Sequence, residues 1–349
     1  MSAVAITGIG EAEPDGGSLE TMIFAAAKAC LADAGRERDD LDGIVIAASD
    51  MVDGRAISSM LTSGPAGAYL NDEINVASSP GHALAQAQMQ ILAGTHERVL
   101  VGSWGKVSES TAGTQAAERL SAEPFYERDG GLSALAAAAL QAQAHRRVAG
   151  ERAEAAAHAV AARNRPGTSP EQVAASPLLA SPLRELEVPP EVDGAFALIL
   201  EAVTGGEAPR LAGIGWSSDI GRIGERRLDR LEHLGLAAAD AYRRAGVALP
   251  AEQVDSWHLH DYTPDAEVLA YEPLGLCAAG EALGLALAGS PAINPGGGSL
   301  RGEAPFGGPL RKVLEAARRL RGGESERAVV QIATGFAGQF QTVAVLERA

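Results

Sequence analysis

The sequence predicts an α/β protein in which one strand–helix unit is used twice. Short aliphatic runs typical of buried strands alternate with Ala-rich helical segments along the chain. An internal repeat supports the duplication, because ACLADAGRERDDLDGIVIAA in the first half parallels DAYRRAGVALPAEQVDSWHLHD in the second. Further along each half, QILAGTHERVLVGS parallels RRLRGGESERAVVQIATG. A chain of 349 residues is long enough for one duplicated fold with a modest insertion.

The first predicted helix has clear sequence signals at both ends. Ser18 is a typical N-cap, Glu20 lies in the first turn, and Gly35 directly follows the last helical residue, Ala34. The other elements of this half follow from aliphatic runs bounded by glycines. They are strands at 4–8, 43–48, 74–77 and 98–103, and a helix at 81–93.

The middle of the chain is expected to form a loop domain inserted between the two halves. Residues 106–131 are polar and rich in turn formers, and residues 164–190 carry several Ser and Pro and are expected to be an extended connection. Two Ala-rich helices are expected between these segments, at 132–149 and 151–163.

The remaining elements complete the first half and form the second. The sequence predicts a strand at 195–200 for the first half. For the second half it predicts strands at 210–217, 254–259, 328–333 and 341–346, and helices at 230–245 and 310–321. The predicted division is an N-terminal half at 1–104 and 191–203, a loop-domain insertion at 105–190, and a C-terminal half at 204–349.

Composition excludes several classes of function. The net charge of −16 argues against nucleic acid and anionic membrane surfaces as partners. No signal segment and no membrane span is evident, so a cytoplasmic protein is expected. The two cysteines, Cys30 and Cys277, are too few for a disulfide framework or a Cys-rich zinc site, and no metal site is expected.

Two segments lead into the second helix of each half and are candidates for chemistry. A strand end that runs into a helix N-terminus exposes N–H groups that can hold an oxyanion. The first segment, INVASSPGH, includes Ala77, Ser78, Ser79 and His82, and the second, INPGGG, includes Asn294, Gly297 and Gly298. Capping is the alternative role for the two serines, and packing or an interface is the alternative for His82. No adjacent base is evident for a serine nucleophile.

These segments and two others resemble the thiolase superfamily, in particular the sterol-carrier-protein-type thiolases. INVASSPGHALAQA resembles the nucleophile block of that family, and SPLLASPLRELEVPPEVDGAFALIL resembles its mid-chain block. HDYTPDAEVLAYEPLGLCAAGEAL and INPGGGSLRGEAPFGGPLRKVLEAARRLRG resemble the His-Asp-Cys-Phe-Thr and Asn-Pro-x-Gly-Gly blocks. The resemblance implies a thiolase-like duplicated five-layer α/β/α/β/α fold and a homodimer formed through edge strands.

The departures from the family pattern exclude the thiolase reaction. Ala77 occupies the place of the nucleophilic cysteine, and alanine cannot form a thioester. Tyr262 replaces the acid/base cysteine, and either Ala304 or Glu303 falls at the histidine of the family's Gly-His-Pro. Near the C-terminus, where other thiolases carry a cysteine, the chain has Ala333-Thr334-Gly335. Cys30 and Cys277 are expected to serve packing.

The motif His260-Asp261-Tyr262 survives and forms the predicted catalytic set. His260 and Tyr262 supply two proton-transfer groups without a nucleophile, and the backbone near Ala77 and Gly335 is expected to hold an oxyanion. A structural histidine is the alternative for His260, and packing is the alternative for Tyr262. The predicted substrate-binding set comprises Ala77, Ser78, Ser79, His82, Asn294, Gly297, Gly298, Glu303 and Gly335.

The resemblance implies an aldolase or lyase that acts on coenzyme A thioesters without a covalent cysteine intermediate. Relatives of this type pair with a small zinc-ribbon/OB-fold subunit, and the same partner is expected here, with no covalently bound cofactor. One alternative is a non-catalytic thiolase-like subunit that binds acyl-CoA or lipid, or that scaffolds a catalytic partner. A second is an acyltransferase that forms no acyl-enzyme. The cluster Arg226, Arg227 and Arg230 is a candidate contact for coenzyme A phosphates.

Overall fold

The computed structural model describes residues 3–12, 16–110 and 113–349. Within these residues the main strands run in the order β3-β2-β4-β7-β1-β8-β11-β10-β9. The first half supplies β1 (Ala3–Ala12), β2 (Gly43–Ala47), β3 (Asp72–Asn75), β4 (Arg98–Gly105) and β7 (Gly194–Val203). The second half supplies β8 (Arg210–Ser218), β9 (Ser256–His258), β10 (Arg327–Thr334) and β11 (Phe340–Glu347).

The strand order confirms the duplication that the sequence predicts. In the first half β2 runs parallel to β4, and β4, β7 and β1 follow as antiparallel neighbours. In the second half β9 runs parallel to β10, and β10, β11 and β8 follow as antiparallel neighbours. The two runs meet through β1 and β8, where Ala5 pairs with Arg210 and the Ile6 N–H donates to the Pro209 carbonyl oxygen at 2.8 Å.

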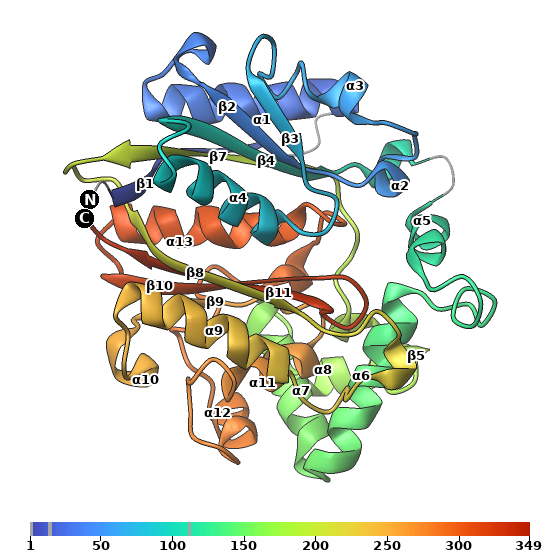
Figure 1. The fold of residues 1–349 in the computed structure, drawn as a ribbon. Coiled ribbons are helices and arrows are strands. Elements are labelled where there is room, and N and C mark those ends of the chain that lie inside the picture. The colour runs from blue at the N-terminus through green and yellow to red at the C-terminus, as the bar shows by residue number, and fades with distance from the viewer. Residues whose placement is uncertain (1–2, 13–15, 111–112) are drawn as a thin grey trace.

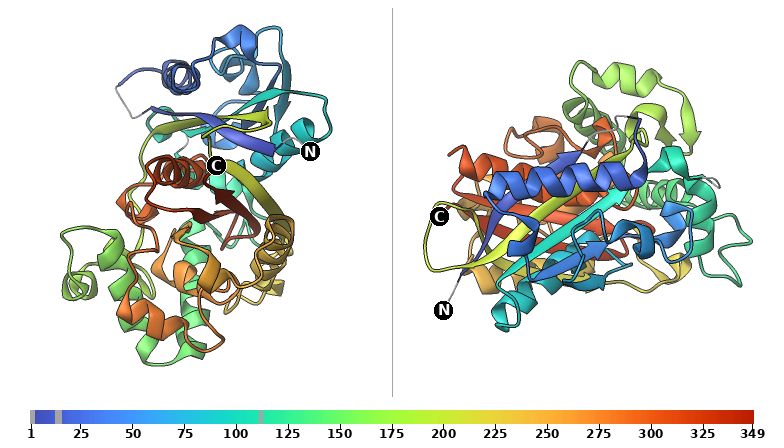
Figure 2. Two further views of the ribbon diagram at one scale, coloured as in Figure 1. Left: turned by 90° about the vertical axis from the view of Figure 1, so that its left-hand side faces the viewer. Right: turned by 90° about the horizontal axis from the view of Figure 1, so that it is seen from above.

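Helices and strands alternate in five layers, as predicted (Figures 1 and 2). Helix α1 (Leu19–Ala34) covers the outer face of the first strand layer. Helices α4 (Pro80–Leu92) and α13 (Arg311–Arg321) lie between the two strand layers. Their apolar faces share one core, in which Leu84 and Leu314 belong to the same cluster as Val45 and Val330. Beyond the second strand layer lie α9 (Glu232–Ala245), α11 (Pro264–Tyr271) and α12 (Ala282–Ala288).

Glycines allow the outer helices to approach the strands closely, and they do so in the same way in both halves. A Cβ at Gly10 would lie 2.1 Å from the Ala26 carbonyl oxygen of α1. A Cβ at Gly215 would lie 2.1 Å from the Ala237 carbonyl oxygen of α9. Both distances are shorter than any real contact, so only glycine fits at these positions. Ser18 caps α1 and Gly35 ends it with a φ of 62°, as predicted.

The middle segment differs in part from the sequence prediction. The two Ala-rich helices are present as α6 (Ala134–Ala149) and α7 (Arg152–Asn164). However, the segment expected to be a polar loop contains α5 (Thr114–Ser121). The expected extended connection contains α8 (Pro170–Ala175) and a hairpin of β5 (Leu178–Ala180) and β6 (Leu183–Arg184). The extended connection predicted here is wrong in part, because Ser169 and Gln172 form a capping box that starts α8.

Five more short α-helices among the described residues were not predicted. They are α2 (Asp50–Asp53), α3 (Ser59–Thr62) and α10 (Pro250–Gln253), together with α11 and α12. The middle segment packs against the C-terminal half, because Ala156 and Val160 of α7 share a core with Leu234 and Trp257. Among the described residues, no helix combines the length and the apolar character that a membrane crossing requires.

Candidate active site

A cavity of about 740 Å³ opens beside the N-terminus of α4. The loop after β9, the segment before α13 and the turn between β10 and β11 all contribute to its wall. Met51, Phe306 and Phe340 are among its apolar residues. Six predicted site residues line this one cavity: Ala77, Ser78, His260, Tyr262, Glu303 and Gly335.

Glu303 and Ala304, the two candidates for the histidine position of the family, lie in different environments. Ala304 is fully buried in the core shared by α4 and α13, whereas the Glu303 side chain faces the cavity. The Glu303 backbone is fixed, because its N–H donates to the Pro190 carbonyl oxygen and its own carbonyl accepts from the Val192 N–H, both at 3.0 Å.

His260, Tyr262 and Glu303, here called the cavity group, are three polar residues of the cavity wall. His260 Nε2 lies 3.4 Å from Glu303 Oε1, and both side chains are about a tenth exposed, at 11% and 8%. Within the described residues, neither Glu303 oxygen nor His260 Nε2 has a hydrogen-bond partner. Buried polar atoms are nearly always paired, so these three atoms remain available to a bound molecule.

Tyr262 is held in its protonated form. Burial raises the pKa of its phenol, and the nearby carboxylates Glu118, Glu191 and Glu303 raise it further. At neutral pH, Tyr262 is therefore a hydrogen-bond donor and not a base. Burial and Glu191 also raise the pKa of Glu118, and Thr114 donates to Glu191 at 2.9 Å.

The described wall of the cavity carries three glutamates but no lysine or arginine. The glutamates are Glu118, Glu191 and Glu303. Sequence reasoning missed Glu118 and Glu191, which lie in or beside the predicted insertion. No motif marks either residue, and only the packing of α5 against the rest of the wall reveals them.

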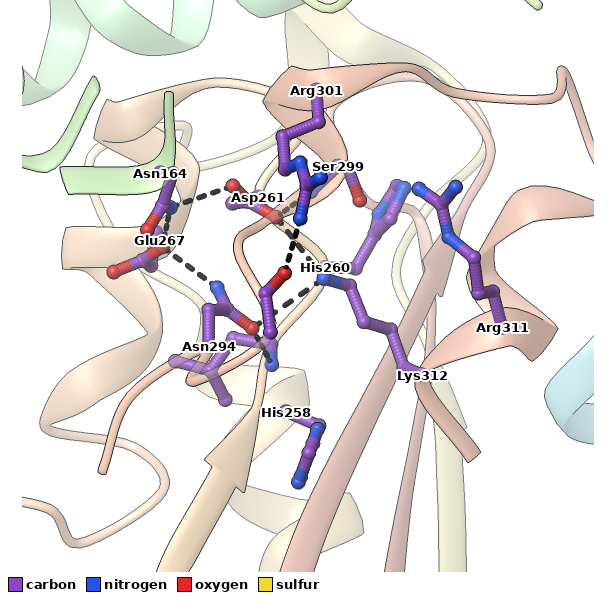
Figure 3. Close-up of polar contacts among 12 residues, drawn as sticks. Asn164, His258, His260, Asp261, Glu267, Asn294, Ser299, Arg301, Arg311 and Lys312 are labelled. Carbon is purple, nitrogen blue, oxygen red and sulfur yellow. Dashed lines mark hydrogen bonds and ion pairs between the residues drawn. The ribbon is translucent and has the colours of Figure 1, made fainter. Parts of the chain in front are cut away.

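Asp261, predicted to be catalytic, does not line the cavity. Its side chain is fully buried and accepts hydrogen bonds from the Ser299 N–H at 2.6 Å and from Asn164 Nδ2 at 2.7 Å (Figure 3). Lys312 Nζ lies 3.6 Å away. A Cβ at Gly298 would lie 1.7 Å from Asp261 Oδ2, so this glycine leaves room for the carboxylate. Asp261 therefore fixes the loop after β9 instead of contacting substrate.

Asn294, Gly297 and Gly298, predicted to bind substrate, also lie outside the cavity wall. Asn294 Oδ1 accepts from the Leu259 N–H at 2.8 Å, and its Nδ2 donates to Glu267 at 2.9 Å. The first bond ties the glycine-rich segment to the residue before His260, and the second, drawn in Figure 3, ties it to α11. The buried polar side chains behind the cavity, here called the buried network, are Asn164, Asp261, Glu267, Asn294 and Lys312.

The start of α4 combines a cap with a polar pair. Ser79 is the N-cap and accepts from the Gly81 N–H at 3.2 Å, which is the capping alternative raised from the sequence. Ser78 Oγ lies 2.8 Å from His82 Nδ1. The sequence offered no evident base near Ser78, so this contact corrects that expectation. Ser79 and His82 themselves do not line the cavity, contrary to their predicted role in substrate binding.

The cysteines and the arginine cluster play no direct part in this cavity. Neither Cys30 nor Cys277 lines it, and burial raises the pKa of both thiols, that of Cys277 to about 11. Arg226 is paired with Asp219 at 3.1 Å and donates to the Phe336 and Ala337 carbonyl oxygens of the cavity wall. The other two arginines, 227 and 230, are paired with the carboxylate at 229.

Fold and sequence comparisons agree on the class of protein, which has a thiolase-like fold. Residues 222–348 match the family described as thiolase C-terminal domain-like. A comparison with curated proteins finds no match. Similar solved structures confirm the thiolase-like fold that the sequence predicts.

Two of these structures cover nearly the whole chain. The Ltp2-ChsH2(DUF35) aldolase is 21% identical, with a TM-score of 0.83 over 99% of this chain and 98% of that one. A monomeric SCP2-thiolase like protein type 1 (STLP1) from Mycobacterium smegmatis is 19% identical, with a TM-score of 0.77 over 99% of this chain and 77% of that one. At these identities the comparisons establish the fold, and function must be argued from the site.

Proposed function

We propose that the protein is an aldolase-type C–C lyase that acts on acyl thioesters of coenzyme A without a covalent cysteine intermediate. The observation that carries this proposal is the cavity group, in which Glu303 and His260 present unpaired polar atoms beside the protonated Tyr262. The alanine at position 77 supports it, because no thiol lines the cavity. The aldolase among the structural neighbours is consistent with the same class of reaction.

The residues suit the cleavage of a β-hydroxyacyl thioester. Glu303 accepts the proton of the β-hydroxyl, the bond between the α and β carbons breaks, and an aldehyde or ketone leaves. The electron pair passes to the α-carbon and forms the enolate of the shortened thioester. N–H donors at His260 and in the backbone at Ala77 and Gly335 stabilise the enolate oxygen.

Tyr262 completes the reaction by giving its proton to the α-carbon. Its raised pKa suits this step, since the phenol keeps its proton until a strongly basic carbanion lies next to it. The proton on Glu303 then returns to Tyr262 by way of His260, and the enzyme is ready for the next substrate. In the reverse direction the same groups join a carbonyl compound to the enolate.

The wall of the cavity indicates which acyl chains are accepted. With three glutamates and no lysine or arginine among the described lining residues, a carboxylate on the acyl chain would meet repulsion. We expect a neutral acyl chain, with the coenzyme A phosphates outside the cavity.

A panel of β-hydroxyacyl-CoA thioesters tests the function. Carbonyl products are trapped with a hydrazine, with and without the proteins encoded next to this one. Glu303→Gln and His260→Ala are expected to abolish product formation, while Glu225→Gln, which alters an exposed carboxylate paired with Arg222, has no effect. Absence of a carbonyl product from every substrate, or full activity in both cavity variants, would overturn the proposal.

An assembly of more than one chain is part of the proposal. One structural neighbour is named as a complex of two components, which supports a small zinc-ribbon/OB-fold partner here. For the homodimer, β3 supplies an edge strand, and the segment leading to it exposes large apolar side chains. These exposed residues are Ile57, Met60, Leu61, Tyr69 and Leu70. If the chain only scaffolds a catalytic partner, the complex will retain activity when His260 and Tyr262 are both replaced.

A further inference from the structure

Ser78 and His82 form a second polar pair at the start of α4, separate from the cavity group. Ser78 precedes the N-cap residue Ser79, and His82 lies in the first turn of the helix. Ser78 Oγ and His82 Nδ1 are 2.8 Å apart, which is hydrogen-bond distance. Because Ser79 already caps the helix, the Ser78 hydroxyl is not needed for that purpose.

The surroundings of this pair fix its geometry. The Ser78 carbonyl oxygen accepts from Thr334 Oγ1 at 2.9 Å, which ties the residue to the end of β10 across the cavity. A Cβ at Gly81 would lie 2.4 Å from Thr342 Oγ1, so α4 packs tightly on β11 at this point. The His82 ring packs edge-on against Phe340, with ring centroids 5.8 Å apart. Ser78 itself lines the cavity, so its hydroxyl is within reach of a bound thioester.

The electrostatics favour a serine that loses its proton to the histidine. Burial lowers the pKa of His82, so its imidazole is neutral at pH 7. In the tautomer with its proton on Nε2, the Nδ1 atom is a hydrogen-bond acceptor for Ser78. Negative charge that develops beside Ser78 lies near the N-terminus of a 13-residue helix, where the helix dipole stabilises it.

We propose that Ser78, with His82 as its general base, attacks acyl thioesters in this cavity and gives the protein a second, thioester-cleaving activity. The Ser78 Oγ–H proton passes to His82 Nδ1 while Oγ bonds to the thioester carbonyl carbon. The C–S bond breaks, and the departing sulfur takes the proton from His82 and leaves as a free thiol. Water then hydrolyses the seryl ester to a carboxylic acid and restores the Ser78 hydroxyl.

This activity is independent of the proposed lyase reaction. Cleavage of a C–C bond needs a β-hydroxyl and leaves the thioester intact, whereas attack by Ser78 needs no β-hydroxyl and releases a free thiol. A saturated acyl-CoA without a hydroxyl group therefore reports on Ser78 alone. Failure of either reaction leaves the other untouched.

The test is to incubate the protein with a series of saturated acyl-CoA thioesters. Release of coenzyme A is followed by chromatography, and the acylated protein by mass spectrometry with peptide mapping. We expect wild type to release coenzyme A and to carry the acyl group on Ser78. In Ser78→Ala and His82→Gln, release should fall by about 10²-fold or more, the usual contribution of a positioned base. Ser176→Ala is the matched control, since Ser176 lies outside the cavity wall and its hydroxyl donates to the Val173 carbonyl oxygen at 2.7 Å.

A gain-of-function variant makes the test independent of a slow wild-type rate. Thiols are stronger nucleophiles than hydroxyls, so Ser78→Cys should accumulate an acyl adduct at position 78 faster than wild type. The proposal is overturned if Ser78→Ala releases coenzyme A as fast as wild type. It is equally overturned if neither wild type nor Ser78→Cys releases coenzyme A or becomes acylated at this residue.

Discussion

His260 and Asp261 are neighbours in sequence and lie in opposite environments. His260 belongs to the cavity group, where its Nε2 and both oxygens of Glu303 have no hydrogen-bond partner within the described part of the chain. Asp261 belongs to the buried network, where the Ser299 N–H and Asn164 both donate to its carboxylate. Buried polar groups therefore play two different roles in this molecule. Paired groups hold the loop after β9 in place, and unpaired groups on that loop are free to meet a substrate.

The two regions therefore respond differently to mutation. Glu303 has no hydrogen-bond partner among the described residues, and its contact with His260 Nε2 is 3.4 Å long, so its removal should cost the fold little. Removal of a paired group from the buried network leaves several buried polar groups short of a partner, which is costly. Stability and turnover should thus change in different sets of variants.

The largest expected effect is the loss of stability in Asp261→Ala. Lys312, whose Nζ lies 3.6 Å from Asp261, would remain buried without this partner. We expect the free energy of unfolding to fall by about 3–5 kcal/mol, measured by urea denaturation. Asp240→Ala, which alters an exposed ion pair with Arg243, is the control. Unchanged stability in Asp261→Ala would show that the buried network does not support the loop.

Glu303→Gln should show the reverse pattern. Loss of the proposed base is expected to reduce kcat for C–C cleavage by about 10²–10⁴-fold. The free energy of unfolding should stay the same or rise, because the variant removes a buried charge that has no hydrogen-bond partner among the described residues. Both quantities are measured on one preparation. A drop in stability together with full activity would assign Glu303 to the fold.

Tyr262→Phe removes the phenolic hydroxyl and leaves the ring in place. We expect about 10²-fold slower cleavage, since the phenol is the proposed donor to the α-carbon. Exchange of solvent deuterium into the α position of the shortened thioester product checks the step directly, and the variant should exchange more slowly than wild type. Equal exchange in both proteins would mean that Tyr262 only packs in the wall.

The smallest expected effect concerns pH and the stability of the region near the buried network. Lys312, together with His258 and Arg311, lowers the pKa of Glu315 from its ordinary value of 4.5 to about 2. A carboxylate whose pKa is lower in the folded state adds stability above its ordinary pKa, and this contribution is lost as the pH falls towards 2. Urea denaturation between pH 7 and pH 2 should thus show a flatter profile for Glu315→Gln than for wild type. Identical profiles would contradict this role for Glu315.

Much of the fold could be predicted because both halves carry the same local signals. The Ala-Gly stops after α1 and α9 and the repeated strands predict the duplication, and the structure confirms it. The caps of α8 and the turns around α2 and α3 were missed because their signals are polar and short. The boundaries of the predicted domains stay a prediction.

The candidate site could be predicted only in part. Strand ends that lead into helices indicated the start of α4. The resemblance to thiolases indicated His260 and Tyr262. The sequence could not say that Asp261 turns inward, since that depends on the space that Gly298 leaves. It also could not place Glu118 and Glu191, which reach the cavity only through long-range packing.

The central claim is that C–C bond cleavage in this cavity needs no thiol. The most direct measurement is carbonyl release from β-hydroxyacyl-CoA thioesters by wild type and by the thiol-free Cys30→Ala/Cys277→Ala variant, both shown to be folded. Our account predicts that both proteins form the carbonyl product and the shortened thioester at the same rate. Loss of the reaction in the folded thiol-free variant, or no carbonyl product from wild type on any substrate, would contradict it.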